Sequence, residues 1–129
     1  MVESKTLLGC EVANEVTYDF AEVNGKVPMI EFLDSLSIKE RAKIFAYIEK
    51  LVELKSNAIP PKENLSKHLE EGIFELRVSF ENRISRSFYF YEAERQIFFT
   101  HGFVKKEQKT PKSEIEKAKA IRKTWRGEK

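Results

Sequence analysis

The sequence predicts an α+β fold with the element order strand, two helices, three strands, helix. Apolar residues recur at helical spacing in two early segments and one late segment. Residues 74–79 alternate between apolar and polar, residues 84–91 are rich in aromatics, and residues 96–103 are apolar enough for a central strand. Short turns join the last three strands, so that part of the sheet is expected to be antiparallel. The length of 129 residues fits a single domain, residues 1–129, in which about residues 1–14 form an irregular extension.

The first strand is predicted at Glu15–Phe20, where Val16, Tyr18 and Phe20 alternate with polar residues. A helix follows, because Pro28 suits a first helical turn. Its apolar residues recur at helical spacing: Met29, Phe32, Leu33 and Leu36.

The second helix begins after Ser37, which forms a capping-box pattern with Glu40. In such a box each side chain is expected to satisfy the backbone N–H of the other residue. One apolar stripe runs along the helix through Ile44, Phe45, Ile48, Leu51 and Val52. Asn57 and the Pro60-Pro61 pair end it.

The three later strands are predicted around residues 74–78, 84–91 and 96–103, with Glu81-Asn82 as a turn between the first two. The middle strand is rich in aromatic residues. The last helix is predicted to begin near Thr110, with Pro111 at its first position. Its apolar stripe consists of Ile115, Ala118, Ile121 and Trp125.

Several classes of protein are disfavoured by composition. Cys10 is the only cysteine, so an internal disulfide is excluded, and a cytoplasmic location is expected. The chain has no apolar run of the roughly 20 residues that a membrane span needs, and residues 1–10 do not resemble a secretion signal. Without a Cys/His cluster, a Gly-rich phosphate loop or a nucleophile elbow, we expect no metal and no cofactor.

Positive charge is concentrated in the later part of the chain. The net charge is only +2, but basic residues outnumber acidic ones from Arg95 to Lys129. A cationic face of this kind suits phosphate groups, and it equally suits a merely solubilising surface.

Arginines in strands indicate phosphate binding more specifically than lysines on a helix, because a guanidinium can hold a phosphate with two hydrogen bonds. Arg77 lies on the polar side of its strand, where the alternative is a salt bridge with Glu75, Glu81 or a carboxylate on a helix. Arg86 shares its strand parity with Phe88 and Phe90, so alternation leaves open whether it is buried or lies on an open, base-stacking face. His101, at the end of the last strand, is a candidate acid–base group with a structural role as the alternative.

Two strand segments, Leu69-Glu70-Glu71-Gly72-Ile73-Phe74-Glu75-Leu76-Arg77 and Arg86-Ser87-Phe88-Tyr89-Phe90, match motifs of a known family. With a third segment, they resemble the phage-derived HigB-like branch of the RelE/ParE toxin superfamily. The third runs from His101-Gly102-Phe103-Val104-Lys105-Lys106 to Gln108-Lys109-Thr110-Pro111, and it is the most specific of the three. The resemblance covers about residues 15–126, with Glu81-Asn82-Arg83 standing where a glycine turn is common.

The resemblance implies a RelE-like fold, in which two N-terminal helices pack on one face of a small, twisted, mainly antiparallel sheet and a C-terminal helix follows. It also implies the toxin of a type II toxin–antitoxin system. Such a toxin would be a metal-independent, ribosome-dependent mRNA endoribonuclease in which the ribose 2′-OH attacks the adjacent phosphate. Its expected partners are a helix-turn-helix, HigA-like antitoxin, mRNA and the ribosome, with no membrane.

The resemblance also implies roles for individual residues. Its catalytic candidates are Arg86, which would hold the scissile phosphate, and Lys105, Lys106, Lys109 and His101. Its RNA-binding candidates are Arg77, Phe90 and Phe103, with Phe90 or Phe103 stacking on a base. The distribution of basic residues adds Arg83 and Lys112 as RNA-binding candidates. We expect Arg86→Ala to abolish activity and to leave the fold intact. Two alternatives remain: a ParE-like gyrase inhibitor, and a phage-derived RNA-binding protein without catalysis.

Overall fold

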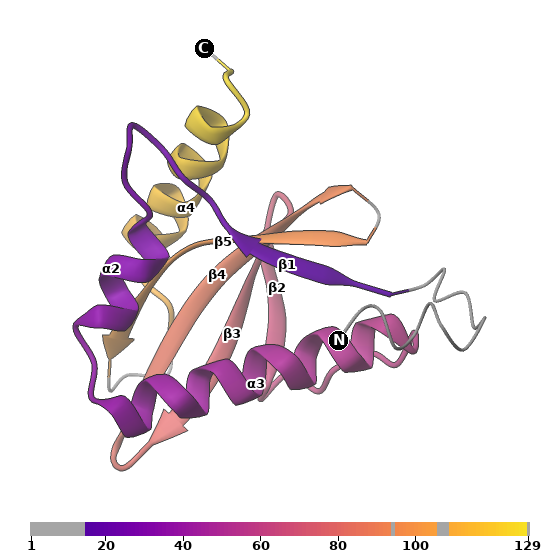
Figure 1. Cartoon of the computed structure of the whole chain (residues 1–129), viewed down its shortest axis with the longest axis vertical. Helices are drawn as coiled ribbons and strands as arrows, with labels where there is room; N and C mark the ends of the chain where they lie inside the picture. The colour runs from indigo at the N-terminus through magenta and orange to yellow at the C-terminus, as the bar shows by residue number, and fades with distance from the viewer. Residues whose placement is uncertain (1–14, 94, 106–108, 129) are drawn as a thin grey trace, which may run out of the picture.

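Three helices and five strands make up the fold (Figure 1). A computed structural model of the chain describes residues 15–93, 95–105 and 109–128. The elements in chain order are β1 (Thr17–Phe20), α2 (Pro28–Asp34), α3 (Ile38–Ser56), β2 (Ser66–Glu70), β3 (Ile73–Phe80), β4 (Arg83–Ala93), β5 (Gln96–Lys105) and α4 (Lys112–Trp125). The predicted α+β class is therefore confirmed.

The strands form one sheet in the order β1-β5-β4-β3-β2. Strand β1 runs parallel to β5, and the other neighbours are antiparallel. Strand β2 was not predicted, because its sequence Ser66–Glu70 is polar and lacks β-branched residues. Glu71 and Gly72 join β2 to β3 with φ values of 50° and 79°, the left-handed conformations that a tight two-residue hairpin requires.

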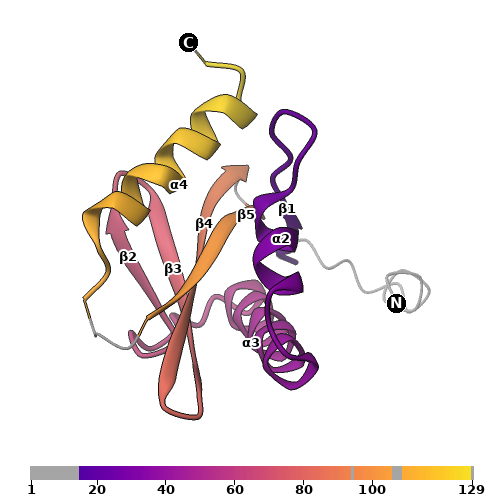
Figure 2. The same cartoon turned by 90° about the vertical axis from the view of Figure 1, so that its left-hand side faces the viewer.

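Both faces of the sheet are covered (Figure 2). Helices α2 and α3 cover one face, and their buried residues Met29, Leu33 and Ile48 share a core with Tyr89 and Phe99. Helix α4 covers the other face. Its core consists of Ile73, Phe88, Phe90, Phe98 and Ala118, with Trp125 packed against it. Adjacent residues of one strand, such as Tyr89 and Phe90, therefore belong to different cores, as strand geometry requires.

Helix α3 begins as predicted, but only half of the capping box is formed. Ser37 Oγ accepts a hydrogen bond from the backbone N–H of Glu40 at 3.2 Å. The Glu40 side chain is buried and binds Arg83 at the start of β4 instead of reaching back to Ser37. Glu40 therefore ties α3 to the sheet, a long-range contact that local capping rules cannot reveal.

Helix α4 starts one residue later than predicted, because Pro111 is its N-cap and Lys112 is its first residue. Ionic contacts join the side chains of α4 to residues near the ends of β2 and β4. Lys112 and Lys119 both bind Glu70, at 2.6 and 3.0 Å, and Arg126 binds Glu92 at 3.1 Å. Charged side chains therefore flank the apolar stripe that packs on the sheet.

Gly102 allows α2 to lie close to β5. A Cβ atom built at this position would lie 2.5 Å from the ring of Phe32 and 3.0 Å from the carbonyl oxygen of Arg86. Real Cβ atoms do not approach other atoms so closely, so only glycine permits this packing. The close packing of α2 on β5 therefore explains the glycine in the His101-Gly102-Phe103 motif.

None of the helices in the described ranges combines the length and the apolar composition of a membrane span.

Candidate functional site

A network of polar side chains lies on the α4 face of the sheet, beneath the start of α4. Arg77 on β3 and Arg86 on β4 are direct cross-strand partners. Two like charges at such positions repel each other unless a counter-charge is present. Glu75 supplies it: Oε2 lies 3.4 Å from Nε of Arg77, and Oε1 lies 3.7 Å from Nη1 of Arg86.

Thr110, which precedes α4, completes this network. Its hydroxyl accepts a hydrogen bond from Arg86 Nη1 at 2.9 Å and donates one to Glu75 Oε1 at 2.6 Å. The segment before α4 is therefore attached to both partners of the buried ion pair. We name Glu75, Arg77, Arg86 and Thr110 the arginine network.

Arg86 is fully buried, with no exposed surface. Burial is the main cause that lowers its pKa, partly offset by Glu75, while the nearby Arg77 lowers it further. The parity with Phe88 and Phe90 thus places Arg86 in the interior. The expectation that Arg86→Ala leaves the fold intact assumed a polar-face arginine, and the buried position of Arg86 contradicts that assumption. We expect the change to destabilise the protein instead, because it would leave Glu75 short of one of its two cationic partners in a buried site.

A groove of about 470 Å³ opens beside the network, between β2, β3 and the start of α4. We call it the basic groove. Its lining includes Lys67, Glu75, Arg77, Lys109, Thr110 and Ile115. Three cations and one carboxylate give it a net positive lining, which suits a phosphate backbone. Lys67 and the hydroxyl of Thr110 were not among the predicted site residues. The signal for Lys67 was its position just before the first motif, and the signal for Thr110 was its place in the third motif.

His101 lies on the same face but inside the core. Its ring stacks on Phe88 with centroids 4.9 Å apart, and its Nε2 lies 2.9 Å from Glu114 Oε1 on α4. Its Nδ1 lies 3.2 Å from the Thr100 hydroxyl. A neutral ring that donates from Nε2 and accepts at Nδ1 satisfies both contacts.

Burial lowers the pKa of His101, and this effect outweighs the hydrogen bond that His101 donates to Glu114, which acts in the opposite direction. Lys117 adds to the lowering. The ring therefore joins α4 to the sheet as a neutral group. This position favours the structural alternative for His101 over the acid–base one.

The other predicted residues fall into separate places. Arg83 lies on the opposite face of the sheet, where it binds Glu40, so the structure does not bring it to the groove. Lys112 binds Glu70 at the rim of α4. Phe90 is buried beneath Trp125, whereas Phe103 is partly exposed and stacks on Phe88 at 5.8 Å. Cys10, Lys106 and the side chain of Lys105 lie outside the described residues.

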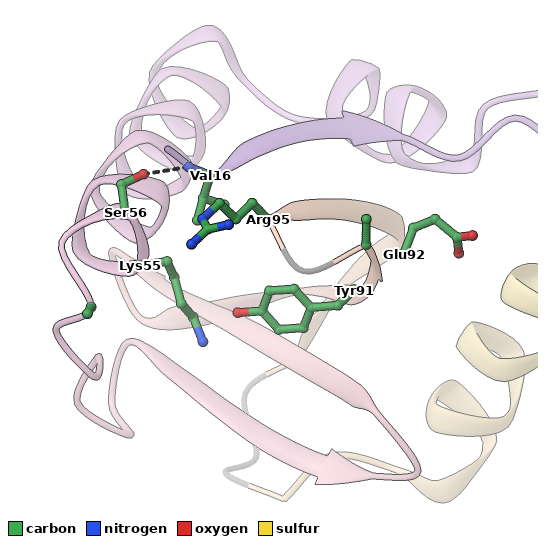
Figure 3. Close-up of a pocket in the computed structure, with 8 residues that line it drawn as sticks. Val16, Lys55, Ser56, Tyr91, Glu92 and Arg95 are labelled. Carbon is green, nitrogen blue, oxygen red and sulfur yellow. Dashed lines mark hydrogen bonds between the residues drawn. The ribbon is translucent and has the colours of Figure 1, made fainter. Parts of the chain in front are cut away.

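A second hollow, of about 590 Å³, lies at the C-terminal end of α3 (Figure 3). Lys55 and Tyr91 face it, and the Lys55 ammonium lies 5.2 Å from the centre of the Tyr91 ring. The backbone N–H of Val16 donates to Ser56 Oγ at 2.7 Å beside it. None of the predicted site residues lines this hollow.

Within the described ranges, no group of three or more His, Cys, Asp or Glu side chains comes together as a metal site.

These features define a small α+β protein with a cationic groove at the start of its C-terminal helix. The family model described as "Phage derived protein Gp49-like (DUF891)" matches residues 31–123, which is more than half of the chain. The chain therefore belongs to the Gp49-like family of phage-derived proteins, a family of RelE-type, toxin-like proteins. Comparison with curated proteins gives no match.

Proposed function

We propose that this protein is the toxin of a type II toxin–antitoxin system and that it cleaves mRNA on the ribosome without a metal ion. The observation that carries the proposal is the basic groove, in which Arg77 and Lys109 lie next to the arginine network. Membership of the Gp49-like family supports the toxin class. The resemblance of its three motifs to the HigB-like branch supports the reaction.

The proposed reaction needs few protein groups, because the nucleophile is the ribose 2′-OH of the substrate. The protein must align the phosphate, stabilise its extra negative charge, remove one proton and supply another. Arg77 and Lys109 line the groove and would bind the phosphate backbone there. Arg86 lies behind Thr110 and would reach the scissile phosphate after the Thr110 segment has moved.

A toxin of this kind acts with an antitoxin that keeps it silent. The family as a whole implies such a partner. We propose a helix-turn-helix, HigA-like protein with an acidic segment that covers the basic groove. Electrostatic attraction would accelerate its association with the cationic lining. Co-expression with the neighbouring gene should yield a stoichiometric complex that Lys67→Glu together with Lys109→Glu weakens, whereas Lys39→Glu with Lys50→Glu on α3 should not.

The test of the activity is induced expression in bacteria followed by analysis of RNA ends. Growth should stop, translation should fall before DNA supercoiling changes, and cut mRNA should carry 2′,3′-cyclic phosphate and 5′-hydroxyl ends. Addition of a chelator to ribosome-bound mRNA in vitro should leave cleavage unchanged. Arg77→Ala with Lys109→Ala should reduce cleavage, and the matched pair Lys39→Ala with Lys50→Ala should not.

Two results would contradict the proposal. Normal growth with abundant folded protein would remove the toxin assignment. Early loss of gyrase-dependent supercoiling with intact mRNA would replace the ribonuclease with a gyrase inhibitor.

A further inference from the structure

The Thr110 hydroxyl occupies an unusual place for a threonine next to a helix start. Such a residue commonly caps the helix by accepting a hydrogen bond from a free backbone N–H. Here Pro111 is the N-cap and no side chain caps α4. The Thr110 hydroxyl instead lies between Arg86 and Glu75, 2.9 Å from the guanidinium and 2.6 Å from the carboxylate.

A hydroxyl held in this way has the contacts that a ribose 2′-OH needs just before it attacks phosphorus. A carboxylate oxygen at hydrogen-bond distance can accept its proton, and an adjacent guanidinium can stabilise the charge that develops on the phosphate. We propose that Glu75 is the general base of the ribonuclease reaction and that Thr110 holds the place of the substrate 2′-OH. This inference rests on the proposed function and assigns the base to a carboxylate that was not among the predicted catalytic residues.

The proposed step balances without a cofactor. The 2′-oxygen forms a bond to phosphorus while the bond from phosphorus to the 5′-oxygen breaks. The 2′-OH proton moves to Glu75 Oε1. The leaving 5′-oxygen takes a proton from an ammonium group of the groove, Lys109 or Lys67. Water then carries the proton from the protonated Glu75 to the neutral lysine, so both groups return to their starting states. The products are a 2′,3′-cyclic phosphate and a 5′-hydroxyl.

The position of Glu75 supports this role. Its side chain is only 3% exposed, yet it belongs to the lining of the basic groove beside Arg77 and Lys109. Thr110 lines the same groove and contacts the carboxylate directly. Movement of this one hydroxyl would therefore open Oε1 to a ribose that is bound between the groove cations.

The network also explains why a carboxylate can stand in a phosphate-binding groove. Arg77 and Arg86 contact its two oxygens from neighbouring strands, so its negative charge is compensated and does not repel the phosphate. The same contacts aim Oε1 at the Thr110 hydroxyl. Glu75 is thus held in a single orientation, as a preorganised base requires.

Glu75→Gln and Thr110→Val provide the test, with Thr110→Ser and Glu71→Gln as controls. Glu71 lies exposed at the β2–β3 turn. The substrate is a short reporter mRNA bound to ribosomes, and the measurements are the single-turnover cleavage rate, the affinity from its concentration dependence, and a thermal melt of each variant. Glu75→Gln should lose roughly 100-fold or more in cleavage rate, the range for loss of a general base, with affinity within about twofold of the parent.

The Thr110 variants test the second half of the inference. Thr110→Val removes the hydroxyl with little change in shape, so it should cleave at the parental rate or faster, because the ribose no longer displaces a competing hydroxyl. Thr110→Ser keeps the hydroxyl and serves as the comparison for Thr110→Val. Glu71→Gln, which lies outside the network and the groove lining, should match the parent. The Thr110→Val measurement stands even if Glu75→Gln fails to fold.

The outcomes separate the two proposals. If the parent leaves ribosome-bound mRNA intact, the proposed function fails and Glu75 loses its role with it. If the parent cleaves and folded Glu75→Gln keeps at least a third of the rate, the general base lies elsewhere. A loss of rate in proportion to affinity would mean that Glu75 only orients the arginines. A loss of more than tenfold in folded Thr110→Val would show that the hydroxyl itself is required, and it would overturn the assigned place of the 2′-OH.

Discussion

Nη1 of Arg86 lies 3.7 Å from Oε1 of Glu75, and neither side chain is more than 3% exposed. Burial of two charges is costly, and each depends on the other for compensation. Arg77, on the same strand as Glu75, shares the carboxylate, so one glutamate serves two arginines that are cross-strand partners on β3 and β4. This relationship governs both the stability of the α4 face and the chemistry of the groove.

Arg86→Ala should destabilise the protein strongly. Removing one partner of a buried ion pair typically costs about 3–5 kcal/mol, because the remaining charge stays buried with less compensation. Urea unfolding measures the change. Arg41→Ala is the matched control, since Arg41 pairs with Asp34 at the surface and such pairs contribute about 1 kcal/mol or less. Equal stability of the two variants would show that the Glu75–Arg86 pair contributes little.

Folding stability should fall between pH 7.5 and 5.5 because of His101. Burial lowers its pKa in the folded protein, so the unfolded chain binds more protons as the pH falls through the ordinary histidine range near 6.5. The contribution is therefore fully present above that range and is lost below it. Denaturant midpoints at several pH values should show this slope in the parent.

Two variants assign the slope to this residue. His101→Phe should flatten it, because a phenyl ring keeps the stacking on Phe88 and does not titrate. His68→Asn should retain it, since His68 is exposed. An unchanged slope in His101→Phe would assign the pH dependence to another group.

Gly102→Ala should lower the melting temperature, because the new methyl group would meet the Phe32 ring at 2.5 Å. Overpacking of this kind costs roughly 1–3 kcal/mol. Phe32→Ala should partly rescue Gly102→Ala in a double-mutant cycle, since removal of the ring removes the clash. Additive effects of the two changes would mean that α2 moves away without cost.

Lys109→Ala should weaken RNA binding and reduce its salt dependence. A lysine that neutralises one phosphate contributes a slope of about 0.7 in the logarithmic salt plot for single strands. Binding of a short single-stranded RNA at several salt concentrations gives this slope. Lys50→Ala on α3 should leave both affinity and slope at the parental values, and an equal effect of the two changes would indicate a diffuse charge effect with no groove contact.

Most elements of the fold were predictable from local patterns. The helices follow from apolar residues at helical spacing and from Ser37, whose hydroxyl does bind the Glu40 N–H. Strand β3 follows from alternation of polar and apolar residues, β4 from its aromatic residues and β5 from its apolar composition. Strand β2 was missed because it forms through pairing with β3 and not through its own composition.

The site was predictable only in part. The motifs indicated Arg77, Arg86 and Lys109, and the structure places Arg77 and Lys109 in one groove with Arg86 behind Thr110. Arg83 was grouped with them by closeness in sequence, yet it is three residues from Arg86 and so points to the other face of the strand. Its partner Glu40 comes from a helix 43 residues away in sequence.

The spacing of polar and apolar residues along the chain is a local property. The sequence alone was therefore sufficient to predict the class of fold, the apolar faces of the helices and the face of the strand to which Arg86 belongs. Parity names the face on which a residue lies but not what covers that face. The burial of Arg86 depends on α4 and Thr110, which come 24 or more residues later, and on Glu75 from the neighbouring strand. Side chains so far apart meet only when the sheet pairs and α4 packs on it, because burial and charge compensation arise from contacts across the whole structure.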